Sequence, residues 1–269
     1  MPVVLVVILL IGYLALVRRA TRRGAGWPWW RTAIFGVLGM GSVLGATLPL
    51  SGAEHRHLWA VAVSMVLLLS ICPAMIALGD PIGLLRRALG ERGNARLERL
   101  LQGPVVRALT FPITAAVLAS AVLGGVFFSP VLGAAVRHSW AMDLTDLVML
   151  MVGLLAALPM LGAEILPAWM SDPVKLLFAF FDGILDAVPG ILVMTTHAKL
   201  AGGYFAGKAS DANWDAHVAG AAMLALTEVV ALPMFFVVFF RWALNETRRR
   251  SVEDDDEPLL STPWWEEQQ

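Results

Sequence analysis

Seven apolar stretches, each close to the length that a membrane-spanning helix needs, run through most of this chain. A helix needs about 20 apolar residues to cross the hydrocarbon core of a bilayer. The stretches cover residues 2–17, 31–50, 58–79, 104–128, 142–163, 174–197 and 216–241. The 269 residues are 58% hydrophobic and only 15% charged, against roughly 25% charged residues in soluble domains. We therefore expect an all-α polytopic membrane protein with seven transmembrane helices in a lipid bilayer.

The basic residues are divided unevenly between the two sides of this arrangement. If the N-terminus lies outside, 16 of the 20 lysines and arginines fall on the cytoplasmic side. The outer side then keeps Arg56, Arg137, Lys199 and Lys208. Cytoplasmic loops of membrane proteins carry such an excess of positive charge. The sequence thus predicts an N-terminus outside and a C-terminus in the cytoplasm.

The segments outside the apolar stretches are short. We predict a transmembrane domain over residues 1–245 and, because of its acidic composition, a disordered cytoplasmic tail over residues 246–269. Residues 80–104 have apolar and basic residues at helical spacing, which predicts an amphipathic helix on the inner surface. Gly41 and Gly45 have the spacing of small residues that suits close helix packing.

The histidines all fall in outer loops or at the outer ends of helices. Imidazole is the commonest transition-metal ligand and titrates near neutral pH, so this distribution is consistent with a metal-handling surface. Loop histidines are also common without any function, and both interpretations stay open. The single cysteine, Cys72, excludes an intramolecular disulfide and a Cys-rich metal motif. The five candidate ligands on this side are His55, His57, His138, His197 and His217.

Two carboxylates stand at the start of the fifth apolar stretch. Met142, Asp146 and Met149 share one face of a helix, with Asp143 beside them. Thioether and carboxylate groups on one face are candidate ligands for a metal in transit. An N-cap is the simpler explanation for Asp143, since Asp is a preferred capping residue. Asp146 lies further into the apolar stretch, and capping does not explain it as well.

Three more acidic residues lie deeper in the predicted bilayer. Asp182 and Asp186 are four residues apart and share a face of the sixth helix, and Glu228 lies in the seventh. Intramembrane carboxylates are energetically costly and mark ion paths or paired charges by default. The alternative is a structural role as a hydrogen-bonded or protonated acid in the core.

Several ordered segments together resemble one family. The segments are "CPAMIALGDPIGLLRRAL", "LTFPITAAVL", "LVMLMVGLLAALPMLG", "DAHVAGAAM", "RWALNETRRR" and the ending "TPWWEEQ". Over roughly residues 30 to 269 the chain resembles the CtaG-type cytochrome c oxidase assembly family, with an ending similar to that of actinobacterial members. The resemblance implies a multi-pass protein of the bacterial plasma membrane, associated with copper delivery to haem–copper oxidases of the respiratory chain.

The chain departs from this family at its usual histidines. The family's histidines on the third helix correspond here to Val61 and Met65, and a further one corresponds to Phe111. On the fifth helix, the pattern His-Glu-x-x-His-x-His falls on Met142, Asp143, Asp146 and Val148. Because a carboxylate is a hard ligand that suits Cu(I) poorly, these departures favour weakened or lost copper binding, or a site moved to the outer histidines.

The resemblance and the residues leave three functional hypotheses. The first is an assembly factor that acts as a copper chaperone from the outer face, with oxidase subunits or copper chaperones as partners. The second is a scaffold for oxidase assembly that binds no metal. The third, an ion or metal permease using the three deep acids, is less favoured because no internal repeat is present. No nucleophile elbow, phosphate loop or zincin motif indicates an enzyme, and nothing indicates nucleic-acid binding.

Overall fold

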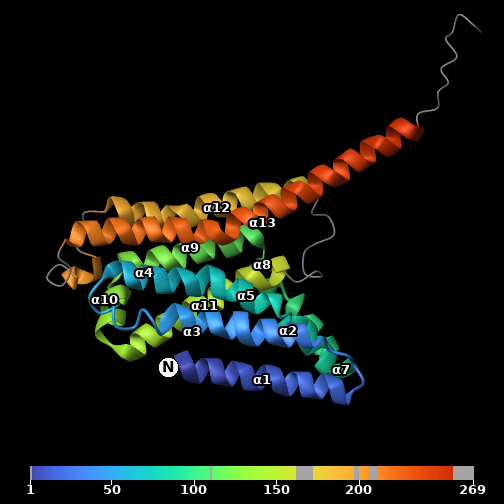
Figure 1. Ribbon diagram of the computed structural model, residues 1–269, viewed down its shortest axis with the longest axis horizontal. Coiled ribbons are helices and arrows are strands. Elements are labelled where there is room, and N and C mark those ends of the chain that lie inside the picture. The colour runs from blue at the N-terminus through green and yellow to red at the C-terminus, as the bar shows by residue number, and fades with distance from the viewer. Residues whose placement is uncertain (1, 110, 162–171, 197–199, 206–210, 257–269) are drawn as a thin grey trace, which may run out of the picture.

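The computed structural model describes residues 2–109, 111–161, 172–196, 200–205 and 211–256, and every regular element in these ranges is a helix (Figure 1). The all-α prediction is thus confirmed for the described part of the chain. The elements are α1 (Pro2–Arg22), α2 (Trp29–Ala33), η1 (Ile34–Met40), α3 (Gly41–Thr47), α4 (Leu58–Val66), η2 (Leu67–Ile71), α5 (Cys72–Leu78), α6 (Pro81–Ala88), α7 (Glu91–Leu101), α8 (Pro104–Leu109), α9 (Pro112–Phe128), α10 (Pro130–Arg137), α11 (Ser139–Leu161), α12 (Asp172–Thr195), η3 (Leu200–Gly203) and α13 (Ala212–Asp256).

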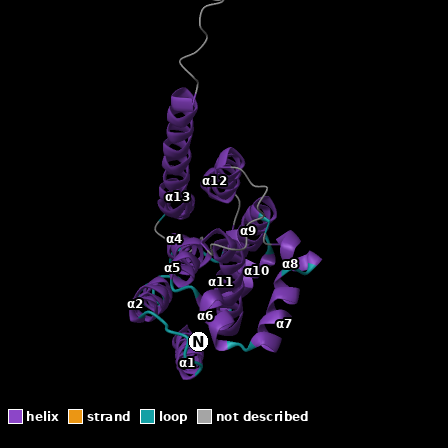
Figure 2. Ribbon diagram, turned by 90° about the vertical axis from the view of Figure 1, so that its right-hand side faces the viewer, coloured by secondary structure: helices purple, strands orange, loops and turns teal. Residues whose placement is uncertain are grey.

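The helices are stacked in layers, as Figures 1 and 2 show from two directions. α12 and α13 lie side by side along one side of the bundle, and α1 lies at the opposite side. Between them, α4, α5, α9 and α11 form the centre, followed by α2, η1 and α3. Leu68, Leu123, Met149 and Met223, from four different elements, are fully buried in the common core.

Each of the seven predicted apolar stretches coincides with one or more of these helices. In the described part of the chain, four segments are long and apolar enough to cross a membrane, namely Pro2–Arg22, Leu58–Leu78, Ser139–Leu158 and Gly183–Gly203. The last of these also includes residues 197–199, which lie outside the described part. A fifth is the pair Ile113–Phe128 and Pro130–Arg137, which is bent by 70° at its break. The apolar helices fit a membrane protein, while seven spans and the orientation of the ends stay predictions.

Two π-helical segments widen the helices that run through the centre. η1 separates α2 from α3, and η2 separates α4 from α5, whose second residue is Pro73. A proline has no amide hydrogen, so the carbonyl of Leu69, four residues earlier, loses its usual helical donor. A Cβ atom at Gly153 of α11 would overlap with that carbonyl oxygen and with the Pro73 ring. α11 therefore packs against this junction by direct backbone contact.

The predicted packing role of Gly41 and Gly45 is wrong in detail. Among the described residues, none would lie within 4 Å of a Cβ atom at either position. Gly39 makes the close approach instead, because a Cβ atom there would lie 3.3 Å from the Cα atom of Ile76 in α5. The π-helical turn of η1 changes which residues face the neighbouring helix, and the α-helical spacing of the sequence did not anticipate this.

α1 is anchored at one end of the bundle and stands apart at the other. The hydroxyl of Tyr13 donates a hydrogen bond to the carbonyl of Gly79 (2.8 Å), and its ring stacks on Phe35 with centroids 3.9 Å apart. Nearby, Arg31 forms an ion pair with Asp80, which also caps α6 by accepting from the amide of Gly83 (2.9 Å). The Tyr13 contacts hold the middle of α1. In its first turns Val6 is buried in the core, while Val3 and Val4 are 50% and 57% exposed.

The predicted cytoplasmic segments are more helical than expected. Residues 80–104 contain α6 and α7, which confirms helices there; their position on a membrane surface stays a prediction. α13 continues to Asp256, so the first part of the segment predicted as a disordered tail is helical, and residues 257–269 lie outside the described part.

Candidate functional site

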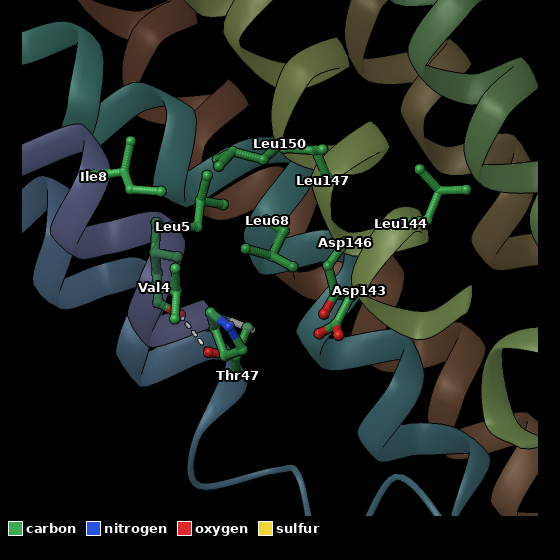
Figure 3. A pocket seen from close by; sticks show the side chains of 12 residues that line it. Val4, Leu5, Ile8, Thr47, Leu68, Asp143, Leu144, Asp146, Leu147 and Leu150 are labelled. Carbon is green, nitrogen blue, oxygen red and sulfur yellow. Dashed lines mark hydrogen bonds between the residues drawn. The ribbon is translucent and has the colours of Figure 1, made fainter. Parts of the chain in front are cut away.

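An apolar cavity of about 280 Å³ lies between α1, α3 and α11 (Figure 3). Side chains from α1 form one wall, and Leu144, Leu147 and Leu150 of α11 form the other. Figure 3 shows Asp143 and Asp146 side by side at the rim, across the cavity from Val4 and Thr47. The complete lining is Pro2, Val4, Leu5, Ile8, Val43, Thr47, Leu68, Asp143, Leu144, Asp146, Leu147 and Leu150.

The two carboxylates owe their position to the start of α11. This helix begins at Ser139, so Asp143 lies beyond its first turn and is not the N-cap. Both aspartates are half-buried. The Oδ1 atom of Asp146 is buried and has no hydrogen-bond partner among the described residues. A buried polar atom without a hydrogen-bond partner is energetically costly, so Asp146 is the group in the cavity that most requires a donor.

A third carboxylate, that of Glu54, belongs to the same charged region. It lies in the loop between α3 and α4 and is 8% exposed. Glu54 and Asp143 are close enough to Asp146 for their negative charges to act on it. Burial raises the pKa of the Glu54 carboxyl above its ordinary value of 4.5, while a hydrogen bond with Ser64 and the charge of His55 partly oppose this shift. Sequence reasoning missed Glu54, because it lies in a loop that the tertiary fold buries.

The methionines of α11 do not join the carboxylates in the cavity. Met142 is 8% exposed and Met149 is fully buried, and both pack in the core rather than line the cavity. Val61 and Met65, which replace family histidines, are also fully buried in α4. The predicted stripe of thioether and carboxylate groups is thus divided between the core and the cavity wall.

Three of the predicted histidines lie at the starts of helices, and each pairs with a tryptophan. The ring centroids are 6.2 Å apart for His57 and Trp59, 6.3 Å for His138 and Trp140, and 6.3 Å for His217 and Trp214. α4, α11 and α13 begin at the same end of the bundle, at the left in Figure 1. His55 is exposed in the loop before α4. His197 lies outside the described residues.

The described residues contain no group of three or more His, Cys, Asp or Glu side chains placed to hold a metal ion. The histidines share one end of the bundle without converging on a point. The carboxylates that do gather, in the cavity rim, are hard oxygen ligands. Over the described residues, the donor set therefore does not fit a resident copper ion.

Of the three deeper acids, Glu228 is the one that the structure places where α13 meets α12. Glu228 of α13 and Asp186 of α12 are half-buried, and the side chain of Asp182 lies outside the described part of the structure. A Cβ atom at Gly183 would lie 3.8 Å from the Oε1 atom of Glu228, so the Glu228 carboxyl faces α12. Further along, Gly190 and Gly220 bring the two backbones together, since a Cβ atom at Gly220 would lie 2.5 Å from the Gly190 carbonyl oxygen.

Asp215 is a buried carboxylate whose role the sequence did not indicate. It lies in the first turn of α13 and accepts hydrogen bonds from the backbone amides of Leu58 (2.7 Å) and Trp59 (3.3 Å). These amides are unpaired donors at the start of α4, which has no side-chain cap of its own. Asp215 therefore joins the ends of α4 and α13 next to His57 and His217.

Comparison with known proteins gives one family and several relatives. The sequence model of the cytochrome c oxidase caa3 assembly factor family matches residues 11–244. Uncharacterized proteins of Mycobacterium bovis and Mycobacterium tuberculosis are each 29% identical over 276 residues, and one of Mycobacterium leprae is 24% identical over 274. These matches cover 92% of this chain and 39% of each relative, so the chain spans about two fifths of their length. No solved structure matches the chain.

Proposed function

Since the chain belongs to the cytochrome c oxidase caa3 assembly factor family, we propose that it serves oxidase maturation as a membrane scaffold that holds an oxidase subunit. Assembly requires a surface that binds another membrane protein and releases it again. The observation that carries the scaffold hypothesis is the open apolar cavity between α1 and α11 with carboxylates at its rim. The assembly role also favours a non-catalytic protein.

The proposal places this action at the outer face of a bacterial plasma membrane. The excess of arginine and lysine at the opposite end of the helices supports this orientation, by the same positive-inside rule that predicts the topology. The cavity rim, the loop with Glu54 and the three histidine–tryptophan pairs then lie together on the outer side. Tryptophan is enriched at membrane interfaces, which agrees with Trp140 and Trp214 being exposed at this end.

A copper role is the second candidate, and the position of the histidines favours it. His57, His138 and His217 share one end of the bundle, where a metal delivered to an oxidase would pass. The described residues do not form a complete ligand set, so copper as a cargo would need additional ligands from a client or a chaperone. Copper handling is therefore the weaker of the two candidates.

One experiment separates the two candidates. In a strain lacking this chain, oxidase activity and the haem absorbance of membranes are measured after complementation with the full chain or with variants. The scaffold hypothesis predicts that H55A/H57A and M142L/M149L restore both signals at ordinary copper supply. Failure of the histidine variant, together with rescue by added copper, would establish the copper role instead. Normal oxidase in the strain without the chain would refute both.

Copper binding itself is measured on the purified full chain. Anaerobic incubation with Cu(I), followed by desalting, is expected to leave no stoichiometric copper on the protein. Retention of a copper ion per chain that H55A/H57A abolishes would contradict the scaffold hypothesis.

A further inference from the structure

The cavity beside α11 is open toward the surroundings of the bundle. Val4 and Ile8 of α1 are 57% and 61% exposed, and Leu144 of α11 is 53% exposed, although all three line the cavity. A volume of about 280 Å³ is just below the range for ligand pockets, so the cavity suits a few inserted side chains rather than a large prosthetic group.

The negative charge at the rim indicates which chemical group the inserted side chains should carry. Asp146 has a buried oxygen without a hydrogen-bond partner in the described structure. Glu54 and Asp143 add negative charge beside it, and the positive charge of the amino terminus opposes their effect only in part. An acyl chain would fill the apolar wall, but it offers no hydrogen-bond donor to the buried oxygen. A cationic donor would both satisfy this oxygen and reduce the repulsion among the carboxylates.

The position of Asp146 along α11 also limits the geometry of the occupant. Asp146 follows the first residue of α11 by seven positions, so it lies about 10 Å along the helix from its start. A lysine or arginine near the end of a transmembrane helix reaches such a depth with its long apolar stem against neighbouring side chains. Leu144 and Leu147 would pack against the apolar face of that helix.

We propose that this cavity is the docking site for a transmembrane helix of an oxidase subunit that carries a lysine or arginine near its outer end. This inference rests on the proposed scaffold function and adds the place of contact and the chemistry of the partner. The bound helix lies along α1 and α11, inserts apolar side chains between Ile8 and Leu144, and donates from its cationic group to Asp146.

Site-specific cross-linking tests the docking site in the intact protein. The photoreactive residue p-benzoylphenylalanine replaces Leu144 or Ile8 in cells that make the oxidase with a different epitope tag on each subunit. Ile184 of α12, which is 48% exposed on the other side of the bundle, is the matched control position. We expect light-dependent adducts with one oxidase subunit from Leu144 and Ile8, and no such adduct above background from Ile184. Adducts only with phospholipid or with a second copy of this chain would overturn the proposal.

Asp146→Leu tests the recognition of charge. This change removes the carboxylate and its unsatisfied oxygen, so the purified protein should melt at a higher temperature while the cross-link from Leu144 is lost. Loss of the cross-link with unchanged or higher thermal stability cannot result from misfolding. An undiminished cross-link in this variant would show that the cationic contact is wrong.

The outcome for the oxidase separates this inference from the proposed function. If the oxidase fails to assemble without the chain but Leu144 and Ile8 give no subunit adduct, the scaffold function stands and the docking site is wrong. If the oxidase assembles normally without the chain, the proposed function fails as well.

Discussion

The carboxylate of Asp215 accepts a hydrogen bond from the backbone amide of Leu58 across 157 residues of sequence. This contact caps α4 with a side chain from α13, and it is buried, with Asp215 only 4% exposed. His57 directly precedes α4, and His217 lies five residues after the first residue of α13. Asp215 thus fixes the relative position of two candidate ligand-bearing segments.

We expect Asp215→Ala to lower the free energy of unfolding by about 2 kcal/mol, because buried amides at the start of α4 lose their acceptor. Thermal unfolding of the detergent-solubilised protein measures this effect. Asp215→Asn, which keeps one acceptor oxygen, should recover part of the loss. Glu98→Ala on the exposed face of α7 is the matched control and should change the unfolding temperature little. An equal effect of both alanine variants would contradict the capping role.

The close contact between α11 and the η2–α5 junction predicts opposite effects of the same substitution at two glycines. Gly153→Ala places a methyl group against the Leu69 carbonyl and should destabilise the protein by about 3 kcal/mol. Gly125→Ala in α9 meets no atom of the described part of the chain within 4 Å. It should stabilise the protein by about 0.5–1 kcal/mol, because glycine is a poor helix former. Unfolding temperatures of the two variants provide the measurement. A stabilising Gly153→Ala would show that the helices are further apart than described.

Burial of Glu54 predicts a specific pH dependence of stability. Its pKa is raised in the folded state, so the folded protein holds this proton more tightly than the unfolded chain does. The stability from this group is fully present below pH 4.5, its ordinary pKa, and is lost as the pH rises through the raised value.

Glu54→Gln tests this dependence, because it removes the titrating group while keeping the size of the side chain. We expect the variant to be more stable than the original protein at neutral pH. As the pH falls, the original protein should gain stability relative to the variant, because Glu54 becomes protonated. Unfolding temperatures between about pH 4 and about pH 8 measure the crossing. His55, Ser64 and Asp146 interact with Glu54 and remain unchanged in this comparison. Parallel curves for the two proteins would contradict the assignment.

The predicted orientation is tested with single cysteines. Ser51→Cys lies in the exposed loop between α3 and α4, and Leu100→Cys lies in α7, where Leu100 is 65% exposed. The native Cys72 is buried and adds little background. In intact spheroplasts, a membrane-impermeant maleimide should label the cysteine at position 51 and not the one at 100. Permeabilised cells are the control, in which both should react. Labelling of position 100 from outside would reverse the proposed topology.

The sequence alone determined the class of the molecule. Apolar stretches of spanning length predict helices because a backbone in lipid must satisfy its own hydrogen bonds, and the helices occur where these stretches lie. The ordered motifs also identified the family, which the match over residues 11–244 confirms. These features are local or repeated along the chain, so they can be recognised without knowing how the helices pack.

Only the tertiary structure decided how the candidate residues are combined. It buried Met142 and Met149 in the core, opened a cavity beside Asp146, and brought Glu54 from a loop to the same charged region. It also paired Asp215 with Leu58. The close helix contact is made by Gly39 and not, as the sequence predicted, by Gly41 or Gly45. These relations join residues far apart in sequence or follow from π-helical turns, and the periodicity of an ideal α-helix contains no information about either.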